Sequence, residues 1–281
     1  MVSLPYIDAE IERMDAGGEP PGYLRHFHWG HFADLDLADD SPQRYFSAAE
    51  AMTERVVAAG EVADGTHVLD VGCGFGGTLD HISSRNEDCR LAGINIDERQ
   101  LSWARRLFGT EGTPVSFVTA DGCVLPVAST SLDHVLAVEC VFHFPSRKRF
   151  FREAARVLKP GGTLALSDFL LAAGSAGSVA VNVQSAGLGE WYGRSATPLT
   201  SAGYERLGRS VGLELLLDDD VTERTLPTYP ALRRLYKESG SADGVTTVDA
   251  VERLARAGGW EYHVLAFRKP PEAGAEAEAG G

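Results

Sequence analysis

A glycine-rich stretch, VLDVGCGFGGTLD at residues 68–80, constrains the fold more than any other part of this sequence. Its first residues form an apolar run with the length of a short buried strand, and TLDHISSR after the glycines reads as a helix. Glycines between a strand and a helix let the backbone approach a ligand closely and present free N–H groups to it. The stretch therefore predicts a strand, a turn and a helix, with a ligand at the turn.

Short strands and helices alternate along the rest of the chain. The expected strands cover residues 67–72, 90–96, 115–121, 133–139, 163–169, 213–219 and 260–270, and the expected helices cover 47–60, 78–85, 98–109, 147–158 and 201–212. Two portions interrupt the pattern and are expected to be irregular, one after residue 169 and one after residue 224. Alternation at short spacing is typical of a parallel sheet wound on both faces, so the sequence predicts an α/β fold.

Composition excludes several classes of protein. The chain has 40 acidic and 26 basic side chains, a formal net charge of -14, which disfavours a nucleic-acid substrate. We find neither an apolar run of ~18 residues nor a secretory leader, so we expect a cytoplasmic protein that does not enter a membrane. The four cysteines form no Cys-x-x-Cys pair, and we expect reduced, buried thiols instead of a zinc or redox site.

The glycine turn also fits a known binding pattern. Gly72, Gly74 and Gly77 match the G-x-G-x-x-G pattern of dinucleotide sites, and Asn95 or Asp97 lies at the distance expected of a ribose contact. This pattern alone does not separate a nicotinamide dinucleotide from S-adenosylmethionine.

Further motifs separate the two. Asp70 precedes the glycines, Asp121 follows the third expected strand, and LKPGGTLALSDF at 158–169 gives a Pro-Gly-Gly turn into the fifth. With these motifs in order and spacing, residues 66–169 resemble the class I S-adenosylmethionine-dependent methyltransferases. The run AVECVFHFPSRKRFFREAARVLKPGG at 137–162 looks like the small-molecule branch, which includes natural-product sugar O-methyltransferases and tocopherol C-methyltransferases.

The resemblance implies a domain plan. It implies a doubly wound, mostly parallel seven-stranded sheet of the Rossmann-like methyltransferase type, with an N-terminal helical lid over residues 1–60. Residues 61–269 would form the core, with substrate-cover insertions near 170–198 and 224–258. Residues 270–281, of low complexity, are expected to be disordered.

The resemblance also implies a set of cofactor-binding residues for S-adenosylmethionine. They are Trp29, Asp70, Gly72, Gly74, Gly76, Asn95, Ile96, Gln100, Asp121, Gly122 and Glu139. Asp70 would lie near the amino end of the cofactor, and Asp121 would accept from the adenine amino group. Asn95 departs from the acidic residue that many members carry for the ribose hydroxyls, so Gln100 would share that contact.

Methyl transfer needs an aligned nucleophile and, for a hydroxyl, a base. His143 is the preferred candidate because it follows the carboxyl end of the fourth expected strand, where ligands bind in this architecture. Related enzymes often carry paired histidines here, and this chain has Phe142 in the first place. Asp168 would orient His143 or act as the base itself. Glu139 would hold the cofactor, hold a substrate group or move a proton.

The stretch HFHWGHF at 26–32 contains three histidines. Their spacing places no more than a pair on one face of a helix or strand, and a metal site is disfavoured. The pair Trp29-Gly30 matches a feature of the resembled branch, a segment that closes over the cofactor. We therefore interpret this stretch as a wall of the site. The expected substrate contacts are Tyr6, His28, Phe142, Phe144, Trp191 and Tyr192, which would favour a largely apolar acceptor.

Several functions stay open at this stage. The first is an O-methyltransferase acting on a specialised metabolite, and the second is a C-methyltransferase acting on an electron-rich ring or an alkene. The glycine pattern also allows a NAD-linked oxidoreductase. A protein that binds the cofactor without transferring its methyl group is a further alternative. The acceptor is expected to be a small molecule, and the sequence leaves open whether the chain forms a homo-oligomer.

Overall fold

A computed structural model describes residues 5–17, 22–36, 39–108, 115–174 and 198–271 of the 281-residue chain. Its centre is a seven-stranded sheet with the order β3-β2-β1-β4-β5-β7-β6. The strands are β1 (His67–Val71), β2 (Arg90–Asn95), β3 (Val115–Thr119), β4 (Leu132–Val138), β5 (Leu158–Leu171), β6 (Glu214–Asp220) and β7 (Trp260–Arg268). β1 to β5 pair in parallel, and β7 runs antiparallel to β5 and β6. The doubly wound, mostly parallel fold expected from the sequence is confirmed.

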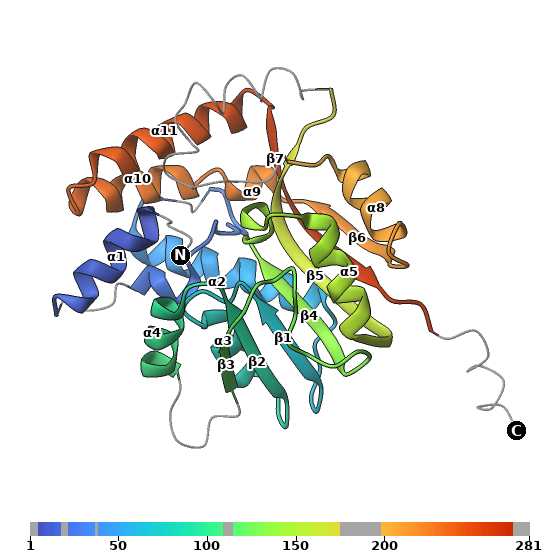
Figure 1. Cartoon of the computed structure of the whole chain (residues 1–281). Coiled ribbons are helices and arrows are strands. Elements are labelled where there is room, and N and C mark those ends of the chain that lie inside the picture. Colours follow the sequence, from blue (N-terminus) through green and yellow to red (C-terminus); the bar gives the residue numbers. More distant parts are fainter. Residues whose placement is uncertain (1–4, 18–21, 37–38, 109–114, 175–197, 272–281) are drawn as a thin grey trace, which may run out of the picture.

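Helices cover both faces of this sheet (Figure 1). Their bounds are α1 (Pro5–Asp15), η1 (Gly22–His26), α2 (Pro42–Ala59), α3 (Gly77–Ser83), α4 (Glu98–Phe108), η2 (Val141–His143), α5 (Arg147–Val157), α8 (Ser201–Arg209), α9 (Thr222–Thr225), α10 (Thr228–Glu238) and α11 (Ala242–Arg256). The expected start of α2 at residue 47 was too late. Ser41 caps this helix by accepting a hydrogen bond from the backbone N–H of Arg44, and Pro42 occupies its first position.

The portion after residue 224 is helical, and our expectation of an irregular segment there was wrong. α10 and α11 pack against each other, and Figure 1 shows them side by side above α2. Apolar residues at helical spacing turn inward from both: Tyr229 and Leu232 are buried on α10, and Val248 and Val251 on α11. The second expected cover of the site is therefore a helical hairpin.

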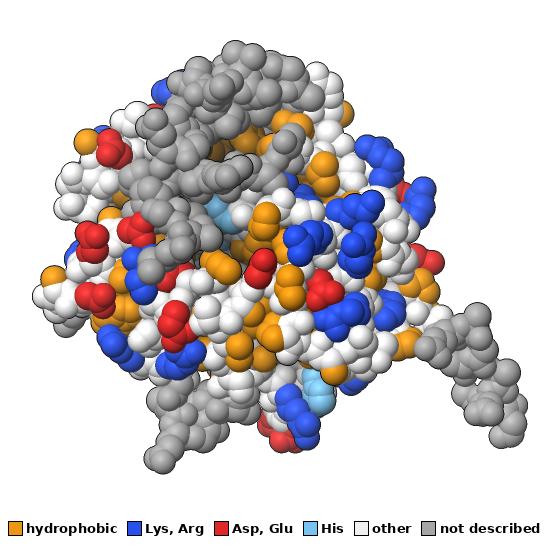
Figure 2. Space-filling model, in the orientation of Figure 1, with side chains coloured by type: hydrophobic (Ala, Val, Ile, Leu, Met, Phe, Trp, Pro, Cys, Tyr) orange, Lys and Arg blue, Asp and Glu red, His pale blue; other side chains and the backbone are white. Residues whose placement is uncertain are grey.

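Two hydrophobic layers sandwich the sheet. On one face, buried residues of α2, α3, α10 and α11 pack together with Val68, Leu136 and Ala165 of the sheet. On the other face, α5 and α8 supply Phe150, Phe151 and Tyr204 among others. Because α2 shares the core with the sheet, this helix is part of the folded body although it falls within residues 1–60. Figure 2 shows many Lys and Arg side chains over α5 and α8, in contrast to the acidic chain as a whole.

The order of the strands places the functional site. The chain passes outward from β1 through β2 to β3 and then returns to β4 on the other side of β1. In open α/β sheets, ligands bind at this reversal, at the carboxyl ends of the strands. The glycine turn follows β1 and Glu139 follows β4, so both lie at the reversal.

No helix among the described residues is long and apolar enough to cross a lipid bilayer. The four cysteines are buried and unpaired, as expected.

Candidate functional site

The glycine turn packs tightly against the residue that follows Glu139. Gly72 has a φ of +76°, and a Cβ added there would lie 2.7 Å from the Cβ of Cys140. Only glycine tolerates both that backbone conformation and that approach. The N–H groups of Gly72 and Cys73 bind the carbonyl of Ile94 on β2, which fixes the turn at the strand ends.

A cavity of about 220 Å³ opens beside this turn. The expected site residues that line it are Gly72, Gly74, Asn95, Ile96, Gln100, Asp121, Gly122, Glu139, His143 and Phe144. Seven further lining residues were not expected: Ile7, Phe27, Phe75, Ala120, Val138, Cys140 and Pro145. Ile7 and Phe27 come from α1 and the segment after η1, so the N-terminal part of the chain does form a wall.

One end of the cavity offers groups suited to a nucleoside. Asn95 is buried, and its side-chain nitrogen has no hydrogen-bond partner among the described residues. Ile96 is 47% exposed and offers apolar surface, while an oxygen of Asp121 accepts a hydrogen bond from the N–H of Cys123 and holds the loop after β3. Asp97, the alternative ribose contact, is instead paired with Arg99 at 2.6 Å and does not line the cavity.

A smaller hollow of about 50 Å³ adjoins the cavity and shares five lining residues with it: Phe27, Gly72, Gly74, Phe75 and Val138. Such a volume suits a small charged group and a water molecule better than a ring system. Asp70 lines this hollow, and its Oδ2 has no hydrogen-bond partner among the described residues. Burial raises the pKa of Asp70 to about 7, although the hydroxyl of Thr78 acts in the opposite direction.

Glu139 lies in the wall of the larger cavity with a strained backbone. Its φ of +46° is unusual for a residue other than glycine and fixes where its side chain starts. Its Oε2 accepts hydrogen bonds from the backbone N–H of Trp29, at 2.8 Å, and from the hydroxyl of Tyr262. Burial raises the pKa of Glu139 to about 8, against the effect of these two hydrogen bonds.

His143 ends η2 and reaches the same cavity. Burial lowers the pKa of its imidazole to about 4, so the ring is neutral near pH 7 and able to accept a proton. Phe142 does not line the cavity. Its ring packs 4.0 Å from the ring of His143 and 5.9 Å from that of Phe169, measured between centroids, and so supports the imidazole from behind.

Asp168 lies on the opposite side of β5 from the one that sequence reasoning assumed. It is fully buried and lines neither hollow. Its Oδ2 accepts hydrogen bonds from the guanidinium of Arg147, at 3.1 Å, and from the hydroxyl of Tyr204. Successive strand residues point to opposite faces, and it is Ser167 that reaches Tyr262 and Glu139. The structure therefore does not bring Asp168 to the cavity as a base.

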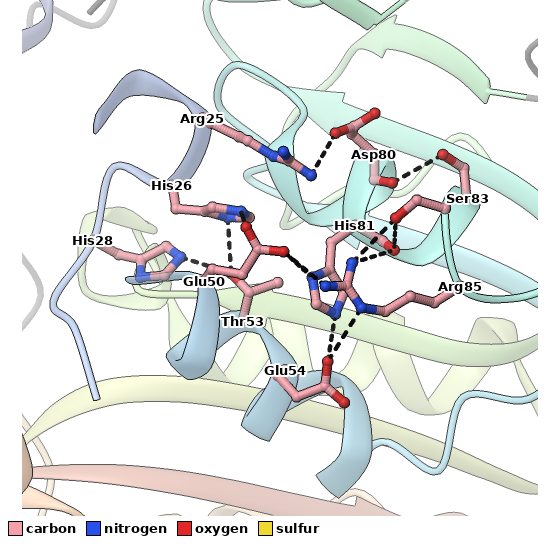
Figure 3. Close-up of polar contacts among 11 residues, drawn as sticks. Arg25, His26, His28, Glu50, Thr53, Glu54, Asp80, His81, Ser83 and Arg85 are labelled. Carbon is pink, nitrogen blue, oxygen red and sulfur yellow. Dashed lines mark hydrogen bonds and ion pairs between the residues drawn. The ribbon is translucent and has the colours of Figure 1, made fainter. Parts of the chain in front are cut away.

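His26, at the end of η1, and His28, just after it, are both held by Thr53 of α2 (Figure 3). Nδ1 of His28 lies 3.0 Å from the carbonyl of Trp29, so this nitrogen must donate, and burial lowers the pKa of His28 to about 4. Nε2 of the neutral ring then accepts from the hydroxyl of Thr53, which in turn accepts from Nδ1 of His26. Both ring nitrogens of His28 are thus engaged within the protein, which leaves only ring carbons for a bound ligand.

The same segment makes close backbone contacts with four parts of the molecule. Four consecutive N–H groups, those of Trp29, Gly30, His31 and Phe32, bind Glu139, Thr228, Ala48 and Arg224. The indole of Trp29 packs between Phe169 and Tyr229 and lines neither hollow. Trp29 therefore reaches the site through its backbone N–H to Glu139, and the structure does not place its side chain in either hollow as the expected cofactor contact would need.

Gly77 has a role that the sequence pattern did not suggest. A Cβ added at this position would lie 1.5 Å from the carbonyl oxygen of Arg25. The third glycine of the motif therefore lets η1 rest directly on the start of α3.

Other expected residues are placed as follows. Gly76 lines neither hollow; it is the N-cap residue just before α3 and lies beside the ring of Phe117. The side chain of Tyr6 and the residues Trp191 and Tyr192 lie outside the part of the chain that the structure describes. Among the described residues there is no group of three or more His, Cys, Asp or Glu side chains arranged to hold a metal ion.

Comparisons with known proteins agree on one family. A family model described as a methyltransferase domain matches residues 69–166. The methyltransferase GfsG of Streptomyces halstedii is 36% identical over 207 residues, which make up 73% of this chain and 72% of that protein. The 27-O-demethylrifamycin SV methyltransferase of Amycolatopsis mediterranei is 33% identical over 205 residues, 72% of this chain and 73% of that protein.

A solved structure shares the fold. The geranyl diphosphate C-methyltransferase of Streptomyces coelicolor, in complex with Mg²⁺, geranyl diphosphate and S-adenosyl-L-homocysteine, superposes with a TM-score of 0.71. The match covers 96% of this chain and 99% of that one at 16% identity. The relatives are methyltransferases, so the alternative of a NAD-linked oxidoreductase is wrong. The chain belongs to the small-molecule branch of the class I methyltransferases, and its cofactor is S-adenosylmethionine.

Proposed function

We propose that this methyltransferase acts on a hydroxyl oxygen of a small, largely apolar specialised metabolite, with His143 as the base. The observation that carries the proposal is the position of His143, whose imidazole lines the cavity beside the glycine turn. The name of the Amycolatopsis relative, which specifies an O-demethylated rifamycin, supports an oxygen acceptor in this branch.

The residues present fit the cofactor along its whole length. Ile96, Asp121 and Gly122 would hold the adenine, and Asn95 with Gln100 would hold the ribose hydroxyls. The unpartnered amide nitrogen of Asn95 agrees with this assignment. The amino-acid end would enter the smaller hollow, where the oxygen of Asp70 without a hydrogen-bond partner is suited to an ammonium group.

When bound, S-adenosylmethionine supplies a methyl group activated by the positive sulfur. The protein must then hold the acceptor oxygen about 3–3.5 Å from that methyl group and take up its proton. His143 does this with a ring nitrogen that is unprotonated near pH 7. Phe142 and Phe169 limit the orientations of the imidazole. Phe27, Val138 and Phe144 give the cavity apolar walls that exclude water and favour an apolar acceptor.

The experiment is a screen of apolar hydroxyl compounds, including O-demethylated macrocycles, by the mass of the product. A gain of one CH₂ shows methyl transfer. For an acceptor so found, His143→Gln should lower kcat by about 10²–10⁴-fold and leave the affinity for S-adenosylhomocysteine within a factor of about two. Phe144→Leu is a control in the same wall without a titratable group. Full turnover in the His143 variant would exclude this residue as the base.

C-methylation is a second candidate, favoured by the aromatic rings that line the cavity. Phe27, Phe75 and Phe144 lie in its wall, where an electron-rich ring face could stabilise a cationic intermediate. His143 or Glu139 would then take the final proton. The position of a ¹³C-labelled methyl group in the product spectrum, on oxygen or on carbon, separates the two candidates.

We also propose that the enzyme works in the cytoplasm on a free small molecule and not on nucleic acid, in keeping with its net charge of -14. Whether copies of the chain associate is a matter for light scattering of the purified protein.

A further inference from the structure

Two carboxyl groups face the cofactor site, Asp70 buried and Glu139 partly buried, and neither makes an ion pair within the described part of the chain. Among the described residues, Asp70 accepts a hydrogen bond from Thr78, and Glu139 accepts hydrogen bonds from the N–H of Trp29 and the hydroxyl of Tyr262. Other buried carboxylates in this protein have a cation beside them, as Asp168 has Arg147. An unpaired buried carboxylate is costly, so both groups are suited to a cation that a ligand brings.

The cofactor and its product differ in charge. S-adenosylmethionine carries an ammonium group, a carboxylate and a positive sulfur, whereas S-adenosylhomocysteine keeps the first two and has a neutral sulfur. A protein carboxylate beside the ammonium group therefore meets a cation in both ligands, whereas one beside the sulfur meets a cation in the cofactor alone. Asp70 lies in the small hollow at the amino-acid end, and Glu139 lies in the larger cavity, where the acceptor meets the methyl group.

We propose that Glu139 pairs with the positive sulfur, so that the protein loses a proton from this residue when the cofactor binds and regains one when the product is formed. Before transfer, the carboxylate of Glu139 offsets the positive sulfur. In the transfer, the acceptor oxygen would form the new C–O bond while the C–S bond of the methyl group breaks, and the electron pair of that bond would neutralise the sulfur. The hydroxyl proton would pass to His143 and from there to Glu139. The negative charge of Glu139 and the positive charge of the sulfur are thus lost together.

The surroundings of Glu139 agree with this exchange. The groups that face it are Tyr262 on β7, Ser167 and Asp168 on β5, Tyr229 on α10, the neighbouring Cys140 and the N–H of Trp29. None of them is a cation, and the charge of Asp168 is offset by Arg147. Burial keeps a proton on Glu139 near pH 7, and His143 in the same cavity is neutral. A cation placed beside Glu139 would lower its pKa and release that proton.

Asp70, in the smaller hollow, likewise faces uncharged groups. It faces Thr78 on α3 and the thiols of Cys73 and Cys140. Arg25 also lines that hollow, and its guanidinium is paired with Asp80 at 2.7 Å. The histidines of the hollow are uncharged, because burial lowers the pKa of His26 to about 2 and that of His28 to about 4. Asp70 therefore meets the ammonium group that both ligands share.

Calorimetric titration in buffers of different ionisation enthalpy tests this assignment, because it counts the protons released on binding. At pH 7 the whole protein is titrated with S-adenosylmethionine, S-adenosylhomocysteine and sinefungin, which has a charged amine in place of the sulfur. We expect S-adenosylmethionine and sinefungin to release up to about one proton more than S-adenosylhomocysteine. Equal release by all three would overturn the proposal without any variant.

Variants locate the proton. Glu139→Gln keeps both hydrogen-bond acceptor contacts and should abolish the difference between the ligands. Asp70→Asn should lower the release common to all three and leave the difference in place. Glu205→Gln, on the surface of α8, is the matched control and should behave as the wild type. A difference that persists in the Glu139 variant would contradict the assignment.

A second readout uses affinity. Ionised Glu139 attracts the charged ligand, so the ratio of the affinities for S-adenosylmethionine and S-adenosylhomocysteine should rise with pH and level off near pH 8, by at most about tenfold per pH unit. In Glu139→Gln the ratio should be flat. The inference concerns the cofactor and not the acceptor, so it survives if the proposed acceptor class is wrong. A protein that binds none of the three ligands would contradict the family assignment itself.

Discussion

Two carboxyl groups near the ends of neighbouring strands are held in opposite ways. Glu139, after β4, accepts from an amide and a phenol and lies in the cavity wall. Asp168, in β5, accepts from the guanidinium of Arg147 and the hydroxyl of Tyr204 and is sealed between β5, α5 and α8. The carboxylate of Asp168 is thus neutralised by a cation of the protein itself, and its contacts hold α5 and α8 against β5. Within the described part of the chain, the carboxyl group of Glu139 has no charged partner, which makes it the one of the two that is suited to a ligand.

The largest change in stability is expected when the ion pair between Arg147 and Asp168 is broken. Arg147→Met should destabilise the protein by about 3–5 kcal/mol, because it leaves Asp168 buried without its cation. The double variant Arg147→Met/Asp168→Asn should recover part of that loss. Chemical denaturation measures both, and a double variant no more stable than the single one would show that packing and not charge is responsible.

A smaller change in stability, in the stabilising direction, is expected when Glu139 is replaced. In the free protein this group keeps its proton up to about pH 8, whereas in the unfolded chain it ionises near its ordinary value of 4.5. Its contribution to stability is therefore full below pH 4.5 and is lost as the pH rises to about 8. Glutamine does not ionise, so Glu139→Gln should not lose stability in this way as the pH rises. The variant should melt higher than the wild type at pH 8, by about 2–4 °C for each kcal/mol of relief.

The pH dependence provides the control for this experiment. The difference in melting temperature between Glu139→Gln and the wild type should shrink as the pH falls towards 4.5. A constant difference at all pH values would mean that the substitution acts through packing. Saturating S-adenosylmethionine should remove the advantage of the variant at pH 8, because the ligand stabilises the ionised carboxylate of the wild type.

The smallest effect is expected from the phenol that binds Glu139. Tyr262→Phe removes one hydrogen bond to the carboxylate, worth about 1 kcal/mol, and should raise the pKa of Glu139 further. The pH at which the ratio of the two ligand affinities levels off should then move upward by up to about one unit. An unchanged profile would mean that Tyr262 only packs against Phe169.

Local motifs predicted the parts of the site that depend on neighbours in sequence. The glycine turn and Asp121 each follow a strand, Asn95 ends one, and parallel strands bring their carboxyl ends to one edge. Asp168 was misplaced because a strand alternates its side chains, and an error of one residue moves a group to the other face. The apolar periodicity of residues 228–256 was present in the sequence, but the prolines and glycines around it suggested loops.

Contacts between residues that are far apart in the sequence could not be predicted from local motifs. Nothing in HFHWGHF shows that His28 pairs with Thr53 or that the N–H of Trp29 reaches Glu139, 110 residues away. Ile7 and Phe27 line the cavity without belonging to any motif. The clash that a side chain at position 77 would make with Arg25 is equally invisible before the chain is folded.

The backbone contacts of residues 29–32 also bear on the order in which the chain acquires its structure. Gly30 binds Thr228, which lies 198 residues later in the sequence. A nascent chain emerges from the ribosome with this segment first, and its partner on α10 follows only after most of the sheet has been synthesised. We therefore expect the wall of the site to close late in biosynthesis, so that a chain stopped before α10 would have the glycine turn but no finished binding chamber.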